Sequence, residues 1–421
     1  MVNKEGHNHV CAARVPFFYG YVIAAAGFVI WMVGFGISNT FGIFYKPMME
    51  DFGWTRADTV FAFSLGTFMM AVLSIASGWL TDKFGPRIVV TVFGSFLGIA
   101  YLMMANTNTL WQFHLSYGVI ASIGMSVTST PIMATVARWF VRRRGLMTGI
   151  VQAGLGIGGL ILVPLTGWLI LNYGWRTTYW VLGIIALIGI ILPGLFMKRD
   201  PRDVGQFSDG TLAPPALTII PGQQKLPDDK VTLRRVFITR QFWLIAGLYA
   251  IFGFCRSTFI AHTAAHVQDK GFSLLNASNV VAALMVSSIV GRIGMGRLAD
   301  AIGSRPAFMI SYAVTAVSLI WVLITGELWG LFLFAFAFGF GWGAQAVLRF
   351  SVTAEAFGLV SLGLIMGILG IGEAFAAALG SYYAGFIFDV LGHYRPAFWT
   401  GVVLSMLGII LAGFLKPLRS Q

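Results

Sequence analysis

Long apolar runs follow one another along almost the whole of this 421-residue sequence, and they constrain its fold more than any other feature. The hydrocarbon core of a bilayer is about 30 Å thick and takes about 20 apolar residues per helical crossing. Only 10% of the residues are charged, whereas about a quarter are charged in a soluble domain. The sequence therefore predicts an all-α polytopic membrane protein with twelve crossings, near residues 17–44, 57–80, 88–106, 110–137, 146–171, 177–197, 241–265, 279–299, 306–325, 328–350, 361–388 and 396–415.

The basic residues gather in alternate connections between these crossings. The net charge is +12, and most of the positive charge follows the second, fourth, sixth, eighth and twelfth crossings. Positively charged connections stay on the cytoplasmic side of a membrane. We therefore expect a multi-pass protein of the cytoplasmic (inner) membrane with both termini inside, and we expect no nucleic-acid partner.

A polar stretch rich in proline and glycine separates six crossings from the next six. Such a composition is typical of a linker. The predicted units are a cytoplasmic tail, a first six-helix bundle, a cytoplasmic linker, a second six-helix bundle and a short tail, at residues 1–16, 17–197, 198–240, 241–416 and 417–421.

Both halves contain the pattern Gly-x-x-x-Asp-x-x-Gly-x-Arg in the turn between their second and third helices. The pattern has its Gly, Asp and Arg at Gly78, Asp82 and Arg87 and again at Gly296, Asp300 and Arg305. The offset is constant, since 296 − 78, 300 − 82 and 305 − 87 all equal 218. We infer a duplication that makes the two bundles pseudo-symmetric. The aspartates can pair with arginines of nearby connections, such as Arg138 and Arg144, and so form a conformational latch; a turn that only sets topology is the alternative.

This repeated pattern resembles the signature loop of the major facilitator superfamily. The stretch Asp82-Lys-Phe-Gly-Pro-Arg-Ile88, followed by Arg138-Trp-Phe-Val-Arg-Arg-Arg-Gly145-Leu-Met-Thr-Gly149, is similar to the oxalate/formate antiporters, and monocarboxylate transporters have a related stretch at the start of their fifth helix. The resemblance implies the major facilitator fold and a small organic anion as cargo. Val163 precedes Pro164, so the Gly-Pro pair expected of drug/proton antiporters is missing.

Arg256, Arg292 and Glu373 are charged residues well inside predicted crossings. An ionisable group in hydrocarbon costs at least about 2.5–3.5 kcal/mol, so each needs a partner or an aqueous cavity. Arg292 stands where both resembled families have an arginine that contacts a substrate carboxylate, and an arginine fork suits that role. The alternative is a structural role for Arg292, in a pair with Glu373 or with a backbone carbonyl. Arg256 has no such counterpart; it either contacts substrate, neutralises Glu373 or pairs near the outer rim.

Glu373 is the predicted proton carrier, because monocarboxylate transporters have a glutamate in the matching stretch of helix eleven. A structural pair with an arginine is its alternative. His262 and His266 lie one turn apart toward the outer face. Histidine titrates near neutral pH, so these two residues can relay protons, or they pack as ordinary polar side chains.

Four further polar or aromatic residues of the crossings are predicted to line the cavity, with helix–helix packing as the alternative for each: Asn39, Gln152, Trp342 and Gln345. Asn39 falls, by register, where animal monocarboxylate transporters carry a functional lysine.

The favoured function is proton-coupled symport of a small monocarboxylate by alternating access. Carboxylate/carboxylate exchange is the alternative, and drug/proton efflux or a non-transporting sensor is less favoured. We find no metal-ligand set, nucleotide loop or nucleophile–base grouping, so we expect neither an enzyme nor a cofactor or bound metal. The expected partners are a small carboxylate, protons and the lipid bilayer, and a monomer can suffice.

Overall fold

The computed structural model describes residues 17–141, 143–210, 233–357 and 362–415, and this part of the chain contains helices and no strand. The first half contains α1 Gly20–Ser38, α2 Phe41–Phe52, α3 Arg56–Phe84, α4 Pro86–Ala105, α5 Leu110–Phe113, η1 His114–Ile120, α6 Ala121–Trp139 and α7 Arg144–Leu195. The connecting region contains η2 Pro201–Val204, η3 Ser208–Gly210 and α8 Leu233–Ile238. The second half contains α9 Arg240–Asp269, α10 Leu274–Ile302, α11 Ser304–Ile324, α12 Leu328–Phe357, α13 Leu362–Leu391 and α14 Arg395–Gly413.

The predicted twelve crossings are confirmed once α7 is divided. Eleven stretches in the described residues are long and apolar enough to cross a bilayer. One of them is α7, whose 52 residues would span about 78 Å at 1.5 Å per residue. Gly174 interrupts it with φ 78° and ψ 164°, a conformation that favours glycine. The chain therefore turns back at Gly174, and α7 supplies the fifth and sixth crossings.

The first crossing was predicted as one helix, and the structure divides it. α1 ends at Ser38, α2 begins at Phe41, and Asn39 and Thr40 form the break. At the break, the carbonyl of Ile37 accepts both the backbone N–H of Thr40, at 3.0 Å, and the Thr40 hydroxyl, at 2.7 Å. Broken helices near the middle of a membrane protein place backbone and polar groups beside a cavity.

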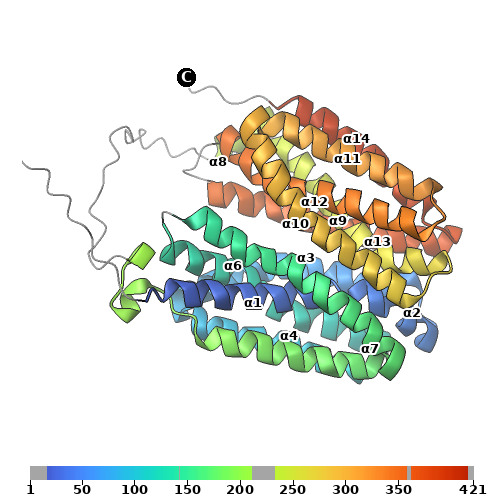
Figure 1. Ribbon diagram of the computed structural model, residues 1–421, viewed down its shortest axis with the longest axis horizontal. Coiled ribbons are helices and arrows are strands. Elements are labelled where there is room, and N and C mark those ends of the chain that lie inside the picture. The colour runs from blue at the N-terminus through green and yellow to red at the C-terminus, as the bar shows by residue number, and fades with distance from the viewer. Residues whose placement is uncertain (1–16, 142, 211–232, 358–361, 416–421) are drawn as a thin grey trace, which may run out of the picture.

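The helices run roughly along the long axis of the molecule and form two bundles that lie side by side (Figure 1). The N-terminal bundle, blue to green, contacts the C-terminal bundle, yellow to red, through α7 with α10, α3 with α13 and α2 with α9. The duplication relates the first two pairings. In the N-terminal bundle α3 is the second crossing and α7 begins with the fifth, and they face the fifth crossing (α13) and the second crossing (α10) of the C-terminal bundle. The predicted pseudo-symmetric arrangement is therefore confirmed.

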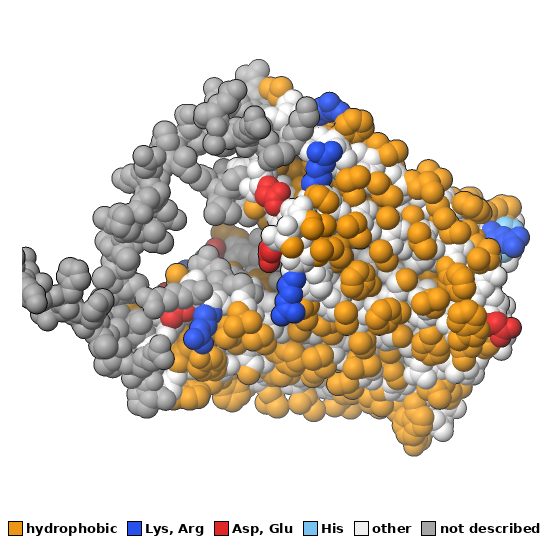
Figure 2. All heavy atoms as spheres, turned by 45° about the horizontal axis from the view of Figure 1, so that its top comes forward, with side chains coloured by type: hydrophobic (Ala, Val, Ile, Leu, Met, Phe, Trp, Pro, Cys, Tyr) orange, Lys and Arg blue, Asp and Glu red, His pale blue; other side chains and the backbone are white. Residues whose placement is uncertain are grey.

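Apolar side chains cover the middle of the molecular surface, and charged side chains collect toward its two ends (Figure 2). Large exposed apolar residues belong to the outward faces of the helices, among them Trp168, Ile188, Val317 and Val403. Apolar side chains that face lipid need no hydrogen-bond partners, and the backbone N–H and C=O groups form their hydrogen bonds within each helix. This distribution is that of a chain embedded in a bilayer.

One end of the molecule carries the linker, and we name it the linker end. Gln206, between η2 and η3, accepts a hydrogen bond from the backbone N–H of Tyr19 and donates to the carbonyl of Phe17. The start of α1 and the linker therefore lie together, and we name the opposite end the far end. The predicted tails 1–16 and 417–421 and most of the predicted linker 198–240 lie outside the described residues.

The bundles are joined between the middle of the molecule and the far end. Every hydrogen bond and ion pair between the bundles, within the described residues, lies in that half. The backbones also approach closely there: a Cβ on Gly385 of α13 would lie 3.2 Å from Ala57 at the start of α3. The structure is thus a far-end-closed arrangement of the two bundles.

Candidate functional site

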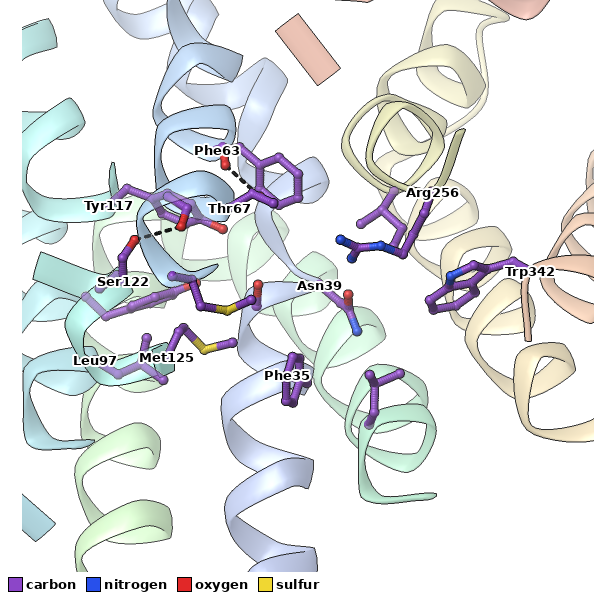
Figure 3. A pocket seen from close by; sticks show the side chains of 17 residues that line it. Phe35, Asn39, Phe63, Thr67, Leu97, Tyr117, Ser122, Met125, Arg256 and Trp342 are labelled. Carbon is purple, nitrogen blue, oxygen red and sulfur yellow. Dashed lines mark hydrogen bonds between the residues drawn. The ribbon is translucent and has the colours of Figure 1, made fainter. Parts of the chain in front are cut away.

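A cavity lies between the bundles near the middle of the molecule (Figure 3). It is lined by α1, the α1–α2 break, α3, α4, η1, α6 and α7 of one bundle and by α9 and α12 of the other. Its empty volume is about 740 Å³ when the space open to solvent is included. Both bundles therefore contribute side chains to this cavity.

Three nitrogen-bearing side chains converge on one side of this cavity: Arg256, Asn39 and Trp342. The guanidinium of Arg256, on α9, points across the cavity toward Asn39 at the α1–α2 break (Figure 3). Within the described part of the chain, the buried Nδ2 of Asn39 and Nε1 of Trp342 have no hydrogen-bond partner. We name these three residues the donor pole, because each presents N–H groups to the cavity.

Arg292 lies beside the donor pole without lining this cavity itself. Its guanidinium carbon lies 5.8 Å from the centroid of the Trp342 ring, in a cation–π contact. Its buried Nε has no hydrogen-bond partner among the residues that the structure describes. Trp342 therefore contacts Arg292 on α10 and lines the cavity into which Arg256 points.

Glu373 is paired with an arginine that the sequence analysis did not single out. The carboxylate of Glu373, on α13, accepts a hydrogen bond from Nη1 of Arg349 on α12. The side chains are 14% and 17% exposed, so this is a largely buried ion pair. The alternative of a Glu373–Arg292 pair is therefore not what the structure shows. Arg349 was overlooked because the predicted crossing ended at residue 350, whereas α12 continues for two more turns to Phe357.

The electrostatics of this region are dominated by guanidinium groups. Glu373 and Arg349 both lie within electrostatic range of Arg256, and Arg349 lies within range of Arg292. The group contains three arginines and one glutamate, so its net charge is +2 when Glu373 is ionised. Buried positive charge without a matching protein anion favours an anionic ligand.

His262 and His266 lie toward the far end and away from Glu373. The Nε2 of His262 lies 2.9 Å from the carbonyl oxygen of Ser381, and its Nδ1 lies 2.9 Å from the hydroxyl of Tyr394. A carbonyl oxygen only accepts, so Nε2 carries the proton and Nδ1 accepts from Tyr394. The ring of His266 packs edge-on against Phe398. Neither histidine lines the central cavity.

Five residues join the bundles at the far end, and we name them the far-end cluster: Lys46, Arg56, Asp269, Asp389 and Tyr394. Arg56 of α3 donates to both oxygens of Asp269 and to the Tyr394 hydroxyl, at 2.8, 2.9 and 2.5 Å. Lys46 lies 2.7 Å from the same aspartate. The carboxylate of Asp389 accepts the first two backbone N–H groups of α3, at 2.9 and 2.6 Å.

The far-end cluster was not predicted, because its charges fall in or next to connections between crossings. In a sequence such charges look like ordinary solvated residues. The cation–π contact of Arg56 with Phe388, at 3.3 Å from the ring centroid, and its 6% exposure show that this residue is enclosed by both bundles.

The two glutamines predicted for the cavity lie within single bundles. Gln345 donates from Nε2 to the Thr315 hydroxyl at 3.0 Å, between α12 and α11. The Nε2 of Gln152 lies 3.8 Å from the sulfur of Met133, between α7 and α6. The structure places neither side chain among the cavity-lining residues.

The repeated motif differs between the halves at the linker end. Asp82 pairs with Arg138 at 2.7 Å, with side chains 65% and 36% exposed, so the pair contributes at most about 1 kcal/mol. Asp300 has no ion-pair partner in the described residues, and Arg305 donates to the carbonyl of Gly413 instead. Arg87 is exposed.

The other motif residues complete this comparison. Gly78 lies near Thr130, since a Cβ there would lie 3.7 Å from its methyl, and a Cβ on Gly296 would meet nothing within 4 Å. The side chain of Arg144 lies outside the described residues.

Comparisons with known proteins agree with this architecture. The sequence profile described as Major Facilitator Superfamily matches residues 26–294 and 267–421. Monocarboxylate transporter 13 of Bos taurus is 25% identical over 386 residues, which cover 90% of this chain and 85% of that protein. Monocarboxylate transporter 11 of Homo sapiens is 27% identical over 428 residues, which cover 96% of this chain and 84% of that protein.

Among solved structures, a bacterial homologue of the human lysosomal transporter Spinster, in an inward-facing and occupied conformation, has the same fold. The TM-score is 0.76 at 14% identity, covering 94% of this chain and 97% of that one. The match of the family profile to almost the whole chain identifies a membrane transporter and not an enzyme. This chain belongs to the Major Facilitator Superfamily.

Proposed function

We propose that this transporter carries small organic anions and works as a proton-coupled monocarboxylate symporter by alternating access. One observation carries the proposal: in the described residues, the N–H groups of Asn39 and Trp342 are buried without acceptors at a cavity that Arg256 enters, and the Nε of Arg292 is buried without an acceptor behind Trp342. An unpartnered buried donor costs about 1–3 kcal/mol. A carboxylate offers about four lone pairs and a negative charge, so it satisfies several of these donors at once.

The relatives support the same substrate class. Two monocarboxylate transporters align with nine-tenths or more of this chain at about a quarter identity. In our proposal, Arg256 holds the carboxylate, Asn39 and Trp342 orient it, and Arg292 adds positive charge from its place against the Trp342 ring and reaches the carboxylate when the cavity changes shape during alternating access. Gln152 and Gln345 support the helices around the site and do not touch substrate.

Proton coupling is proposed for Glu373 because its ion pair with Arg349 links proton and anion binding. Protonation of Glu373 removes the only carboxylate among three guanidinium groups and leaves Arg349 without its counter-charge. A bound anion stabilises that extra positive charge. Anion binding therefore favours proton binding and, by linkage, the reverse, which is what symport requires. His262 and His266 act in this proposal through the far-end cluster and not as a relay to Glu373.

Exchange of one carboxylate for another without protons is the second candidate. The observation that favours it is the same ion pair, since Glu373 already has a counter-charge and needs no proton to be stable.

The topology belongs to the proposal as well. The linker end is placed in the cytoplasm, in the cytoplasmic membrane, as the basic connections indicate. Asp82 with Arg138, Arg144 and the matching residues Asp300 and Arg305 are proposed as the latch that closes the linker end in the opposite conformation.

Transport by purified protein in proteoliposomes tests the proposal. An inside-alkaline pH gradient should drive accumulation of a radiolabelled monocarboxylate, and a protonophore should abolish it. Counterflow that persists without any response to the pH gradient would favour exchange. Neither accumulation nor counterflow for any acid, with correctly folded protein, would contradict organic-anion transport.

A further inference from the structure

The cavity has two chemically unlike sides. Across from Arg256, the wall formed by the N-terminal bundle is lined mainly by aromatic and aliphatic side chains, of which Phe35 lies next to Asn39 (Figure 3). We name this wall the apolar pole, and its main members are Phe35, Phe63, Leu97, Tyr117 and Met125. Arg256 is the one charged residue among all the described residues that line the cavity.

Three hydroxyl groups near the apolar pole, those of Thr67, Ser122 and Tyr101, donate to backbone carbonyls and not to the cavity. Thr67 donates to the carbonyl of Phe63 at 2.9 Å, and Ser122 donates to the carbonyls of Gly118 and Gly66 at 2.8 and 3.0 Å. Tyr101 donates to the carbonyl of Ile37 at 3.2 Å. These three hydroxyl groups already donate within the N-terminal bundle. A second carboxylate on this side of the cavity would therefore find no cation and none of these three donors.

The aromatic side chains of this wall are held by neighbouring rings. Phe63 lies 4.8 Å from Phe41 and 6.3 Å from Tyr117 between ring centroids, and Phe35 lies 4.6 Å from Trp31. Ring pairs at these separations stabilise each other's orientation. The apolar pole is thus a preformed surface that accepts another ring or a branched chain.

We propose that the substrate is a monoanion with a sizeable apolar body, such as an arylalkanoic or branched-chain carboxylic acid. This inference rests on the proposed function, because the carboxylate is assigned to the donor pole. The apolar body lies against Phe35, Phe63 and Met125. Formate and acetate leave this surface uncovered and gain little from it. Oxalate and succinate bring a second carboxylate that would be desolvated without a partner.

Binding of a matched set of acids to the full-length protein tests this inference. Isothermal titration would compare phenylacetate and 4-methylpentanoate with acetate, formate, oxalate and succinate, and phenylacetamide would serve as the neutral analogue. We expect phenylacetate and 4-methylpentanoate to bind at least about tenfold more tightly than acetate, because each buried methylene contributes roughly fourfold. We expect no binding of phenylacetamide or of either dianion.

The outcomes separate this inference from the proposed function. Arginine-dependent binding of acetate or oxalate that equals or exceeds phenylacetate binding would overturn the substrate class and leave anion transport standing. If phenylacetamide binds as tightly as phenylacetate, or if none of the acids binds, both the substrate class and the proposed function would be overturned.

A substitution that fills the apolar pole gives a second, independent readout. Met125→Phe on α6 should weaken phenylacetate binding at least about tenfold and leave acetate binding unchanged. Met309→Phe, on α11 and outside the cavity lining, is the matched control and should change neither. Leu97→Phe on α4, also in the apolar pole, is the second filling variant if Met125→Phe does not fold. Equal weakening of both acids in a folded filling variant would contradict the placement of the apolar body.

Discussion

The guanidinium of Arg56 on α3 donates two hydrogen bonds to the carboxylate of Asp269 at the end of α9, at 2.8 and 2.9 Å. This forked pair joins the N-terminal bundle to the C-terminal bundle. The Arg56 side chain is 7% exposed, so water screens the pair far less than it screens an ordinary surface pair. Together with Lys46 and Asp389, the pair holds the bundles in contact at the far end.

Asp269→Asn should favour conformations that are open at the far end. The change leaves Arg56 and Lys46 without their shared counter-charge. Breaking a fully buried pair costs about 3–5 kcal/mol. The Asp269 side chain is 22% exposed, so we expect a smaller cost, on the order of 2 kcal/mol, which exceeds a tenfold shift in population.

The shift can be measured by labelling Ser64→Cys with a membrane-impermeant maleimide, after Cys11 and Cys255 are replaced by serine. Ser64 and Ser381 hydroxyls meet at 2.7 Å between the bundles, so the new thiol reacts only when the far end opens. Asp58→Asn is the matched control, because the Asp58 carboxylate bonds Thr55 at the start of its own helix. Equal labelling of the Asp269 and Asp58 variants would contradict the role of this cluster in closure.

Tyr394→Phe should lower stability by about 1–3 kcal/mol, because it leaves the buried Nδ1 of His262 without a partner and removes one of the acceptors of Arg56. The hydroxyl accepts from Arg56 and donates to Nδ1 of His262. Burial raises the pKa of Tyr394, so the hydroxyl keeps the proton that it donates. The midpoint of thermal unfolding reports the loss.

Tyr383→Phe is the control for that measurement, since its hydroxyl makes one bond, to Thr400, at 2.9 Å. We expect the Tyr394 variant to lose clearly more stability than the Tyr383 variant. Similar midpoints for both variants would mean that the Arg56–Tyr394–His262 chain adds nothing to stability.

Glu373→Gln should separate exchange from proton-driven accumulation. The amide cannot carry the proton, so a pH gradient should no longer drive uptake, whereas counterflow of the same acid should persist. Glu355→Gln is the control, because Glu355 accepts from Ser304 near the linker end and outside the cavity. Accumulation at the wild-type level in the Glu373 variant would assign proton coupling to another group.

The crossings and the duplication were predictable because both depend on local sequence. Each helix needs about 20 apolar residues whatever its neighbours are, and the Gly–Asp–Arg pattern repeats at a fixed offset. Even the division of α7 follows from local chemistry, since only glycine adopts the backbone angles of Gly174 easily. Helix ends were less predictable. Arg349 was overlooked because it lies next to the predicted end of a crossing, whereas α12 continues beyond it.

Ion-pair partners were not predictable from the sequence. Glu373 pairs with Arg349, 24 residues away, and Arg56 pairs with Asp269, 213 residues away, because the three-dimensional fold brings them together. The same holds for polar residues in helices. Asn39 and Gln345 look alike in the sequence, yet Asn39 borders the cavity and Gln345 bonds Thr315 inside one bundle.

Uptake of a labelled monocarboxylate by proteoliposomes that contain Arg256→Gln or Arg292→Gln tests the central claim most directly. Arg297→Gln, an exposed arginine on the same helix as Arg292, is the matched control. We predict that the Arg256 and Arg292 variants each lose at least about tenfold in uptake at wild-type reconstitution levels and that the control keeps its uptake, because a charge-assisted bond to the carboxylate is worth about 1.5–3 kcal/mol. Undiminished uptake in both the Arg256 and the Arg292 variant would contradict the claim that these guanidinium groups hold an anionic cargo.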